Sequence, residues 1–303
     1  MQFLYFLESI RIPGLNEFML GITYFGDEIA FLVTALILFW CVDKRQGYYI
    51  LSVGFLGTIA NQFMKLWFRI PRPWVQDPNF TILEQAREAA TGYSFPSGHT
   101  QSSVGTFGGI ARTTKNKWVR IAAIVIAVLT PFSRMYIGVH TPLDVLVAAA
   151  MALVLIFVVH PVVFRKDGKY IPYLLGIMTL LAIGYLCFVE FYPFPADVDE
   201  YNLSHGLQNA YTFLGALSGL LIVYIVDEKW LRFPTKAVWW AQLLKILIGL
   251  GLVLLIKSGL KTPLNALFGE LAGRAVRYFL IVIMAGIVWP LSFKYFAGLK
   301  AKE

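Results

Sequence analysis

The sequence has little charge, almost no cysteine and no long polar segment. Only 15% of its 303 residues are charged, against about 25% in soluble globular domains. This low charged fraction argues against a disordered chain and against a nucleic-acid-binding protein. The two cysteines, Cys41 and Cys187, both lie in apolar runs, which argues against a disulfide scaffold. Internal repeats, low-complexity segments and soluble linkers are absent from the sequence as well.

Long apolar runs dominate the chain instead. Hydrophobic residues make up 58% of it, and its mean hydropathy of +0.66 is typical of an integral membrane protein. A helix needs about 20 mostly apolar residues to cross a bilayer. We therefore predict an all-α fold, a polytopic transmembrane helical bundle of about nine spans near residues 28–42, 48–68, 99–112, 118–134, 142–164, 172–192, 205–226, 236–257 and 275–296.

The pattern divides the chain into three regions. Residues 1–27, where charged side chains interrupt the apolar ones, are predicted to form an amphipathic segment in the membrane interface. Residues 28–165 are predicted to form a core of five spans that carries the polar motifs described below. Residues 166–303 are predicted to add further transmembrane helices of unknown role. Their Glu190 and Lys245 either form an ion pair within the membrane or snorkel separately to its surfaces.

Basic residues are distributed unevenly between the two sides of the predicted spans. Of the 26 lysines and arginines, 15 fall in loops on one side and seven in loops on the other. Because basic loops tend to stay in the cytosol, we predict a cytosolic C-terminus and an N-terminus outside. The polar motifs then lie on the extracytoplasmic side of what we expect to be the plasma membrane.

The first polar motif ends the second predicted span. It reads KLWFRIPRP from Lys65, so Arg72 follows seven residues later, between two prolines. Proline does not continue a helix, so the helix ends here and its cations lie at the membrane surface. Taken alone, the motif is equally consistent with a basic helix end that snorkels to lipid headgroups.

The second motif, FPSGHT at residues 95–100, precedes a predicted helix. Ser97 suits the N-cap, which leaves the amides of Gly98 and His99 without partners inside the helix. Such free amides can bind a phosphate group, and glycine lets the anion approach closely. An ordinary serine-capped helix start is the alternative, but it does not explain the titratable His99 at the same place.

The third motif combines Arg134, His140 and Asp144. We predict Thr141 as the N-cap of the next helix and Asp144 as its third residue, so the Asp144 carboxylate folds back toward His140. A carboxylate that holds one imidazole nitrogen leaves the other nitrogen free to attack. A capping aspartate beside a surface histidine is the alternative, but it leaves Arg134 unexplained.

Together the three motifs strongly resemble the signature of the type 2 phosphatidic acid phosphatase superfamily, which shares its site with the vanadium-dependent haloperoxidases. That signature is K-x6-R-P, then P-S-G-H, then S-R-x5-H-x3-D. This chain matches every position, with Lys65, Arg72, Pro73, Pro96, Ser97, Gly98, His99, Ser133, Arg134, His140 and Asp144. The resemblance covers about residues 28–165.

The resemblance implies a role for each site residue. It makes His140 the nucleophile that forms a phosphohistidine, Asp144 the residue that orients it, and His99 the general acid that protonates the leaving oxygen. The residues implied to hold the phosphoryl oxygens are Lys65, Arg72, Ser97, Gly98 and Arg134. Cations and amide donors stabilise a phosphoryl group in transfer, so we expect neither a metal nor another cofactor.

A site at the outer membrane boundary suits a substrate with a phosphate head and an apolar tail. The expected partner is a lipid phosphate or a polyprenyl diphosphate in the bilayer, and the motifs do not choose between them. Nine spans also resemble the glucose-6-phosphatase branch, so a sugar phosphate phosphatase is one alternative and a lipid phosphotransferase another. A non-catalytic transporter or scaffold is disfavoured because no motif residue is missing. No nucleic-acid partner is expected, and the oligomeric state stays open.

Overall fold

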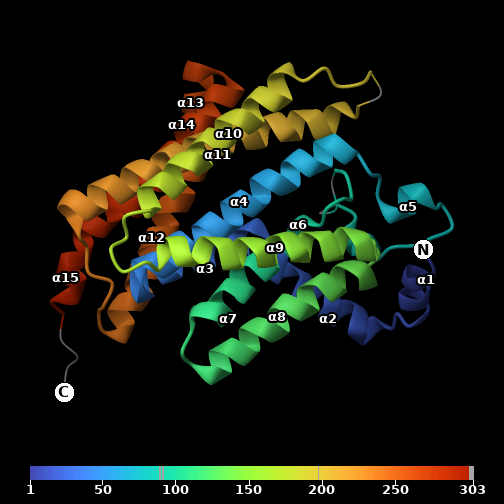
Figure 1. Cartoon of the computed structure of the whole chain (residues 1–303), viewed down its shortest axis with the longest axis horizontal. Coiled ribbons are helices and arrows are strands. Elements are labelled where there is room, and N and C mark those ends of the chain that lie inside the picture. The colour runs from blue at the N-terminus through green and yellow to red at the C-terminus, as the bar shows by residue number, and fades with distance from the viewer. Residues whose placement is uncertain (89, 91, 197, 300–303) are drawn as a thin grey trace. The chain divides into compact units, whose positions relative to one another are not determined.

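The computed structural model describes residues 1–299 except 89, 91 and 197, and this part of the chain contains helices and no strand (Figure 1). Its helices are α1 (Gln2–Ser9), α2 (Pro13–Thr23), η1 (Tyr24–Gly26), α3 (Glu28–Ile37), η2 (Leu38–Val42), α4 (Lys44–Phe68), α5 (Pro73–Gln76), η3 (Glu84–Ala86), α6 (Gly98–Ser103), η4 (Val104–Gly108), α7 (Gly109–Thr113), α8 (Lys117–Tyr136), α9 (Pro142–Val163), α10 (Ile171–Phe191), α11 (Glu200–Val226), η5 (Asp227–Leu231), α12 (Trp239–Gly259), α13 (Lys261–Phe268), α14 (Glu270–Ile283), η6 (Met284–Val288), η7 (Trp289–Ser292) and α15 (Phe293–Ala297).

Six helices of the described chain are long and apolar enough to cross a membrane. They cover Lys117–Tyr136, Pro142–Val163, Ile171–Phe191, Glu200–Leu231, Trp239–Gly259 and Glu270–Ala297. A seventh span results if Pro13–Gly26 and Glu28–Val42, which meet at a 56° bend, count as one. The all-helical membrane fold agrees with the prediction, but its count of about nine spans is not confirmed. The predicted third span is the uninterrupted helical run of α6, η4 and α7, which is too short to count among these spans, and α4 carries polar residues along its second half.

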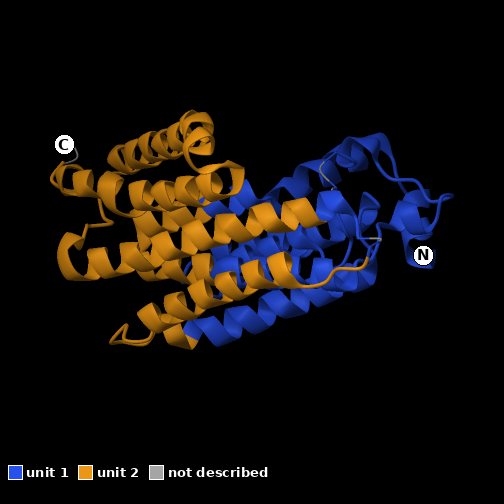
Figure 2. Ribbon diagram, turned by 90° about the horizontal axis from the view of Figure 1, so that it is seen from above, with its two compact units in different colours: residues 1–32, 53–160, 196–202 blue, residues 33–52, 161–195, 203–303 orange. Residues whose placement is uncertain are grey.

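The described chain divides into two compact units (Figure 2). Unit 1 comprises residues 1–32, 53–160 and 196–202, and unit 2 comprises residues 33–52, 161–195 and 203–303. All eight residues predicted to form the site belong to unit 1.

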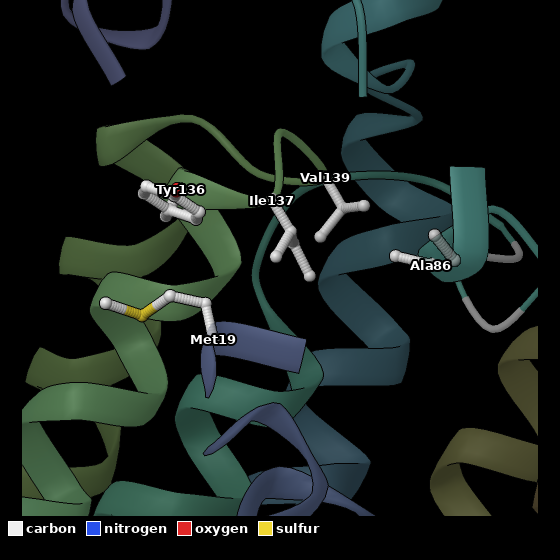
Figure 3. Packing of buried hydrophobic residues seen from close by; sticks show 6 residues of the cluster. Met19, Ala86, Tyr136, Ile137 and Val139 are labelled. Carbon is white, nitrogen blue, oxygen red and sulfur yellow. The ribbon is translucent and has the colours of Figure 1, made fainter. Parts of the chain in front are cut away.

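A buried apolar cluster in unit 1 anchors the loop that leads to His140. Met19 of α2, Ala86 of η3 and the segment 136–139 at the end of α8 pack together (Figure 3). The Tyr136 hydroxyl donates to Asn16 Oδ1 at 2.8 Å, and the Leu83 amide donates to the Ile137 carbonyl at 3.1 Å. Because each buried apolar side chain contributes about 1.5–3 kcal/mol, this packing holds the loop in one position.

Unit 2 contains a buried lysine whose partners differ from the prediction. Lys245 of α12 is fully buried, and its ammonium group donates to the carbonyls of Trp40 and Thr235 at 2.7 and 3.0 Å and to Gln242 Oε1 at 3.0 Å. Glu190 lies exposed on α10. The predicted Glu190–Lys245 ion pair is therefore wrong, because neutral oxygens satisfy the buried ammonium group.

Candidate active site

The first motif turns sharply away from α4 and then caps a short helix. The Arg69 amide donates to the Lys65 carbonyl at 3.0 Å, and Arg69 adopts a left-handed conformation with φ of 50°. Arg72 is the N-cap of α5, whose first residue is Pro73. Lys65, in the last turn of α4, donates from its ammonium group to the Tyr93 carbonyl. Both cations are thereby directed toward the segments that carry the other motifs.

Arg72 joins the first motif to the third. Its Nε donates to the Gly92 carbonyl at 2.9 Å, and its Nη1 donates to the Val139 carbonyl, also at 2.9 Å. The same Nη1 lies 2.9 Å from His140 Nε2. The Arg72 side chain is only 7% exposed, so this contact forms in a nearly dry environment. A guanidinium N–H here meets an imidazole nitrogen that must act as acceptor.

The second motif begins α6 as predicted. Ser97 is the N-cap, and its Oγ accepts from the Thr100 amide at 3.3 Å. The amide of Gly98, the first helical residue, has no acceptor inside the helix. The Ser97 amide donates to the Asp144 carbonyl at 3.1 Å, which joins this motif to the third. Asn61 of α4 supports the turn, since its Nδ2 donates to the Pro96 carbonyl at 3.2 Å.

A glycine-terminated helix end delivers His140 to the site. At the end of α8, the Val139 amide donates to the Arg134 carbonyl and the Gly138 amide to the Met135 carbonyl, both at 3.1 Å. These two bonds form a Schellman motif, in which Gly138 takes a positive φ of 91°. The reversal places His140 directly before α9.

Thr141 and Asp144 cap α9 reciprocally, as predicted. The Asp144 Oδ2 accepts from the Thr141 amide at 2.7 Å, and the Thr141 Oγ1 accepts from the Asp144 amide at 3.3 Å. This folds the carboxylate back so that its Oδ2 lies 3.5 Å from His140 Nδ1. His140 and Asp144 are both about 1% exposed, so the pair is buried.

Cations surround the buried His140. Burial lowers the pKa of His140 well below its ordinary value, and the positive charges of Arg72, Arg134 and Lys65, with His99, lower it further. The imidazole is therefore neutral at neutral pH, and its lone pair is available. Burial also lowers the pKa of Arg72 to about 10, which still leaves a cation at neutral pH. Arg134, 2% exposed, donates from Nη1 to Thr23 Oγ1 at 2.6 Å.

A polar cavity of about 300 Å³ adjoins the second motif. The cavity is lined by residues of η1, α3, α4 and α6. These residues are Gly26, Glu28, Phe31, Thr58, Asn61, Gln62, Gly98, His99, Gln101 and Ser102. Because Gly98 and His99 form part of its wall, a group bound at the start of α6 has space beside it. No three His, Cys, Asp or Glu side chains cluster as metal ligands within the part of the chain that the structure describes.

Comparison with known proteins decides the family. Residues 45–167 match the PAP2 superfamily, and residues 211–302 match the PAP2 superfamily phosphatase, transmembrane extension. The chain is similar to phosphatidylglycerophosphatase B of Bacillus subtilis, with 33% identity over 164 residues, which are 50% of this chain and 76% of that protein. The chain belongs to the PAP2 superfamily. It is an integral membrane phosphatase, as the motifs predicted.

Other PAP2 relatives extend the comparison. The chain is 30% identical over 148 residues to the undecaprenyl-diphosphatase BcrC of Bacillus subtilis, covering 47% of this chain and 74% of that protein. It is 25% identical over 271 residues to sphingosine-1-phosphate phosphatase 1 of Mus musculus, covering 83% of this chain and 60% of that protein. The PAP2 match contains all three motifs, whereas the extension lies in the half without a motif.

Two residues beside the PAP2 motifs were missed by the sequence analysis. The Ser94 hydroxyl donates to Asp144 Oδ2 at 2.6 Å and lies 3.5 Å from His140 Nδ1. Asp27 Oδ1 lies 2.7 Å from His99 Nε2. Ser94 directly precedes the second motif, so its position was a usable signal. Asp27 lies far upstream of every motif, and nothing in the local sequence connects it with His99.

Proposed function

We propose that this PAP2 phosphatase removes a phosphoryl group from a lipid phosphate or a polyprenyl diphosphate through a phosphohistidine on His140. The observation that carries the proposal is the environment of this imidazole. Its Nδ1 faces the Asp144 carboxylate, and its Nε2 lies 2.9 Å from an Arg72 donor in a buried, cationic site. The names of the relatives support the substrate class, since they act on phosphatidylglycerophosphate, undecaprenyl diphosphate and sphingosine 1-phosphate.

The nucleophile follows from the tautomer. Because Nδ1 faces a carboxylate, the proton resides on Nδ1 and the lone pair on Nε2, where the Arg72 donor meets it. In the proposed reaction the phosphoryl oxygens accept the Arg72 N–H groups, and Nε2 attacks phosphorus. Ser94 and the Thr141 amide hold Asp144 Oδ2 in place, so the carboxylate stays fixed during the attack.

The remaining motif residues hold and release the phosphoryl group. Lys65, Arg72 and Arg134 supply positive charge, and the Ser97 hydroxyl and Gly98 amide supply further donors. In a low-dielectric site such preorganised donors are worth more than in water, and they need no metal ion. His99 donates a proton to the leaving oxygen, and the departing alcohol or phosphate occupies the cavity beside it. Water then hydrolyses the phosphohistidine.

The lipid substrate is favoured over a soluble sugar phosphate. The sugar phosphatase alternative depended on a count of about nine spans, which is not confirmed. We propose that the site faces the extracytoplasmic side of the plasma membrane, because the loops on the other side carry most of the basic residues. Residues 166–303 are proposed to be an accessory region, since all motif residues precede them.

Replacing the nucleophile tests the mechanism. We expect His140→Ala to reduce phosphate release below detection while the protein stays folded in detergent, because the substitution removes the proposed nucleophile. Wild type incubated with a ³²P-labelled lipid phosphate should give an acid-labile, base-stable phosphoenzyme that His140→Ala lacks. His205→Ala removes an exposed histidine of α11 and should retain activity. Turnover by His140→Ala at the wild-type rate would refute the proposed nucleophile.

A substrate panel tests the rest of the proposal. Phosphate release from phosphatidylglycerophosphate, undecaprenyl diphosphate, sphingosine 1-phosphate and glucose 6-phosphate should be measured with EDTA present. We expect turnover of at least one lipid substrate, unaffected by EDTA, and little turnover of the sugar phosphate. Loss of all activity in EDTA, restored by a divalent cation, would contradict metal-independent chemistry. A phosphorylated acceptor exceeding free phosphate would favour the phosphotransferase alternative.

A further inference from the structure

His99 is paired with a carboxylate that none of the three motifs contains. Asp27 lies between η1 and α3, and its Oδ1 lies 2.7 Å from His99 Nε2. The His99 side chain is 20% exposed and that of Asp27 37% exposed, so the pair sits at the edge of the site rather than in open water. Asp27 is close enough for a charge-assisted hydrogen bond.

Close backbone packing fixes this pair. A Cβ atom added to Gly26 would lie 2.7 Å from His99 Cβ and 2.8 Å from the His99 carbonyl oxygen. Only glycine therefore allows the turn at 24–26 to approach the first turn of α6 this closely. The following residue, Asp27, directly precedes α3, and its carbonyl accepts from the Phe31 amide of that helix at 3.1 Å. The backbone that carries the Asp27 carboxylate is thus fixed on both sides.

The pair assigns different tasks to the two nitrogens of His99. An ionised carboxylate can only accept, so the Nε2 that faces Asp27 carries a proton. Nδ1 is then the ring nitrogen left to exchange a proton with the substrate. His140 is arranged the other way round, because its carboxylate faces Nδ1 and leaves Nε2 for attack. The two histidines thus form two carboxylate–imidazole pairs. The carboxylate faces Nε2 in His99 and Nδ1 in His140.

We propose that Asp27 is the positioning residue of the general acid, and that it holds Nε2–H of His99 so that Nδ1 carries the transferred proton. This inference rests on the proposed function. In the first step, protonated His99 gives its Nδ1 proton to the leaving oxygen as the P–O bond breaks and the bond from His140 Nε2 to phosphorus forms. In the second step, Nδ1 takes a proton from water as the hydroxide formed attacks phosphorus and the N–P bond breaks. Asp27 stays ionised throughout and stabilises the imidazolium.

Two substrates with different leaving groups test this role. An alkyl phosphate needs a proton on its leaving oxygen, whereas 4-nitrophenyl phosphate releases a stable phenolate without one. We expect Asp27→Asn to lower kcat on the alkyl phosphate by about 10- to 100-fold, with KM changed less than about twofold, because part of the general-acid contribution is lost. On 4-nitrophenyl phosphate the decrease should be less than about threefold. Asp27→Glu keeps the charge and should recover part of the loss.

A matched control and a spectroscopic measurement complete the test. Glu17→Gln removes an exposed carboxylate of the preceding helix, α2, and should behave as wild type on both substrates. An equal decrease on both substrates in Asp27→Asn, or none, would overturn the positioning role. If wild type hydrolyses neither substrate, the proposed function fails, but the pairing is still tested by ¹⁵N NMR of labelled histidines. Neutral His99 should be protonated at Nε2 in wild type, and protonation at Nδ1 would overturn the inference.

Discussion

The two histidines of this site, His140 and His99, are suited to different chemical roles because their surroundings differ. His140 is buried among cations, and its pKa lies well below the ordinary value, which keeps its lone pair free. His99 lies nearer the surface; burial and the charge of Arg134 lower its pKa to about 4, and the Asp27 carboxylate opposes this shift by stabilising the protonated ring. One histidine is thus suited to attack and the other to proton transfer.

Removing one cation should raise the pKa of His140. Arg72 lies 2.9 Å from Nε2, and its positive charge disfavours the imidazolium form. We expect Arg72→Gln to move the His140 titration to higher pH, measured by NMR of labelled histidine in detergent. Arg69→Gln is the control, because Arg69 donates to the backbone carbonyls of Leu66 and Trp67 instead. An unchanged or lowered pKa in Arg72→Gln would contradict this electrostatic account.

The ends of helices, more than their interiors, build the catalytic geometry. The end of α8 reverses at Gly138, the start of α9 folds Asp144 back, and the start of α6 exposes its amides. The residues that form these ends, Gly138, Thr141 and Ser97, lie within two residues of His140 or His99 in the sequence. Helix ends also carry unpaired backbone donors and acceptors, which makes them natural places to bind an anion.

The reversal at Gly138 should not tolerate a side chain. Its φ is 91°, and an added Cβ would lie 2.9 Å from Arg11 Nη2 and 3.1 Å from atoms of Ile82 and Phe80. We expect Gly138→Ala to destabilise the fold by about 1–3 kcal/mol and to lower kcat more than tenfold, because His140 shifts. Thermal unfolding and phosphate release measure the two effects. Gly14→Ala, where nothing lies within 4 Å, should change neither, and a fully active Gly138→Ala would contradict the proposed link.

At the scale of the whole molecule, the sidedness of the site decides which substrates reach it. Lys44 and Lys65 lie at opposite ends of the 25-residue α4. The end of this helix that carries Lys65 is followed by the loop 69–72, and its other end begins with the basic residues Lys44 and Arg45. In the proposed orientation, with the site on the extracytoplasmic side, a lipid phosphate in the outer leaflet reaches the site without crossing the membrane.

Labelling with a membrane-impermeant thiol reagent tests this orientation. In a protein whose Cys41 and Cys187 are replaced by Ala, Asn79→Cys should react in intact cells. Lys115→Cys, in the loop between α7 and α8, should react only after the membrane is permeabilised. Asn79 and Lys115 are both exposed within unit 1, so a difference in labelling between the two cysteines reports the side of the membrane and not the burial of the side chain. The opposite labelling pattern would place the site on the cytosolic side.

The sequence alone determined the features that depend on neighbouring residues. The spacing of Ser97 and Thr100, and of Thr141 and Asp144, specified two helix caps, because capping is a local hydrogen bond. Apolar composition specified a membrane protein, and the three motifs specified the PAP2 family. The count of about nine spans is not confirmed, because hydropathy along a chain does not separate lipid-facing helices from those packed within the protein.

Only the tertiary structure decided which distant groups meet. The contact of Arg72 with His140, the pairing of Asp27 with His99, and the carbonyl partners of Lys245 join segments far apart in the chain. The approach of the Gly26 backbone to His99 depends on tenths of an ångström. Such contacts follow from how helices pack, and packing sums over many weak interactions that no local pattern encodes.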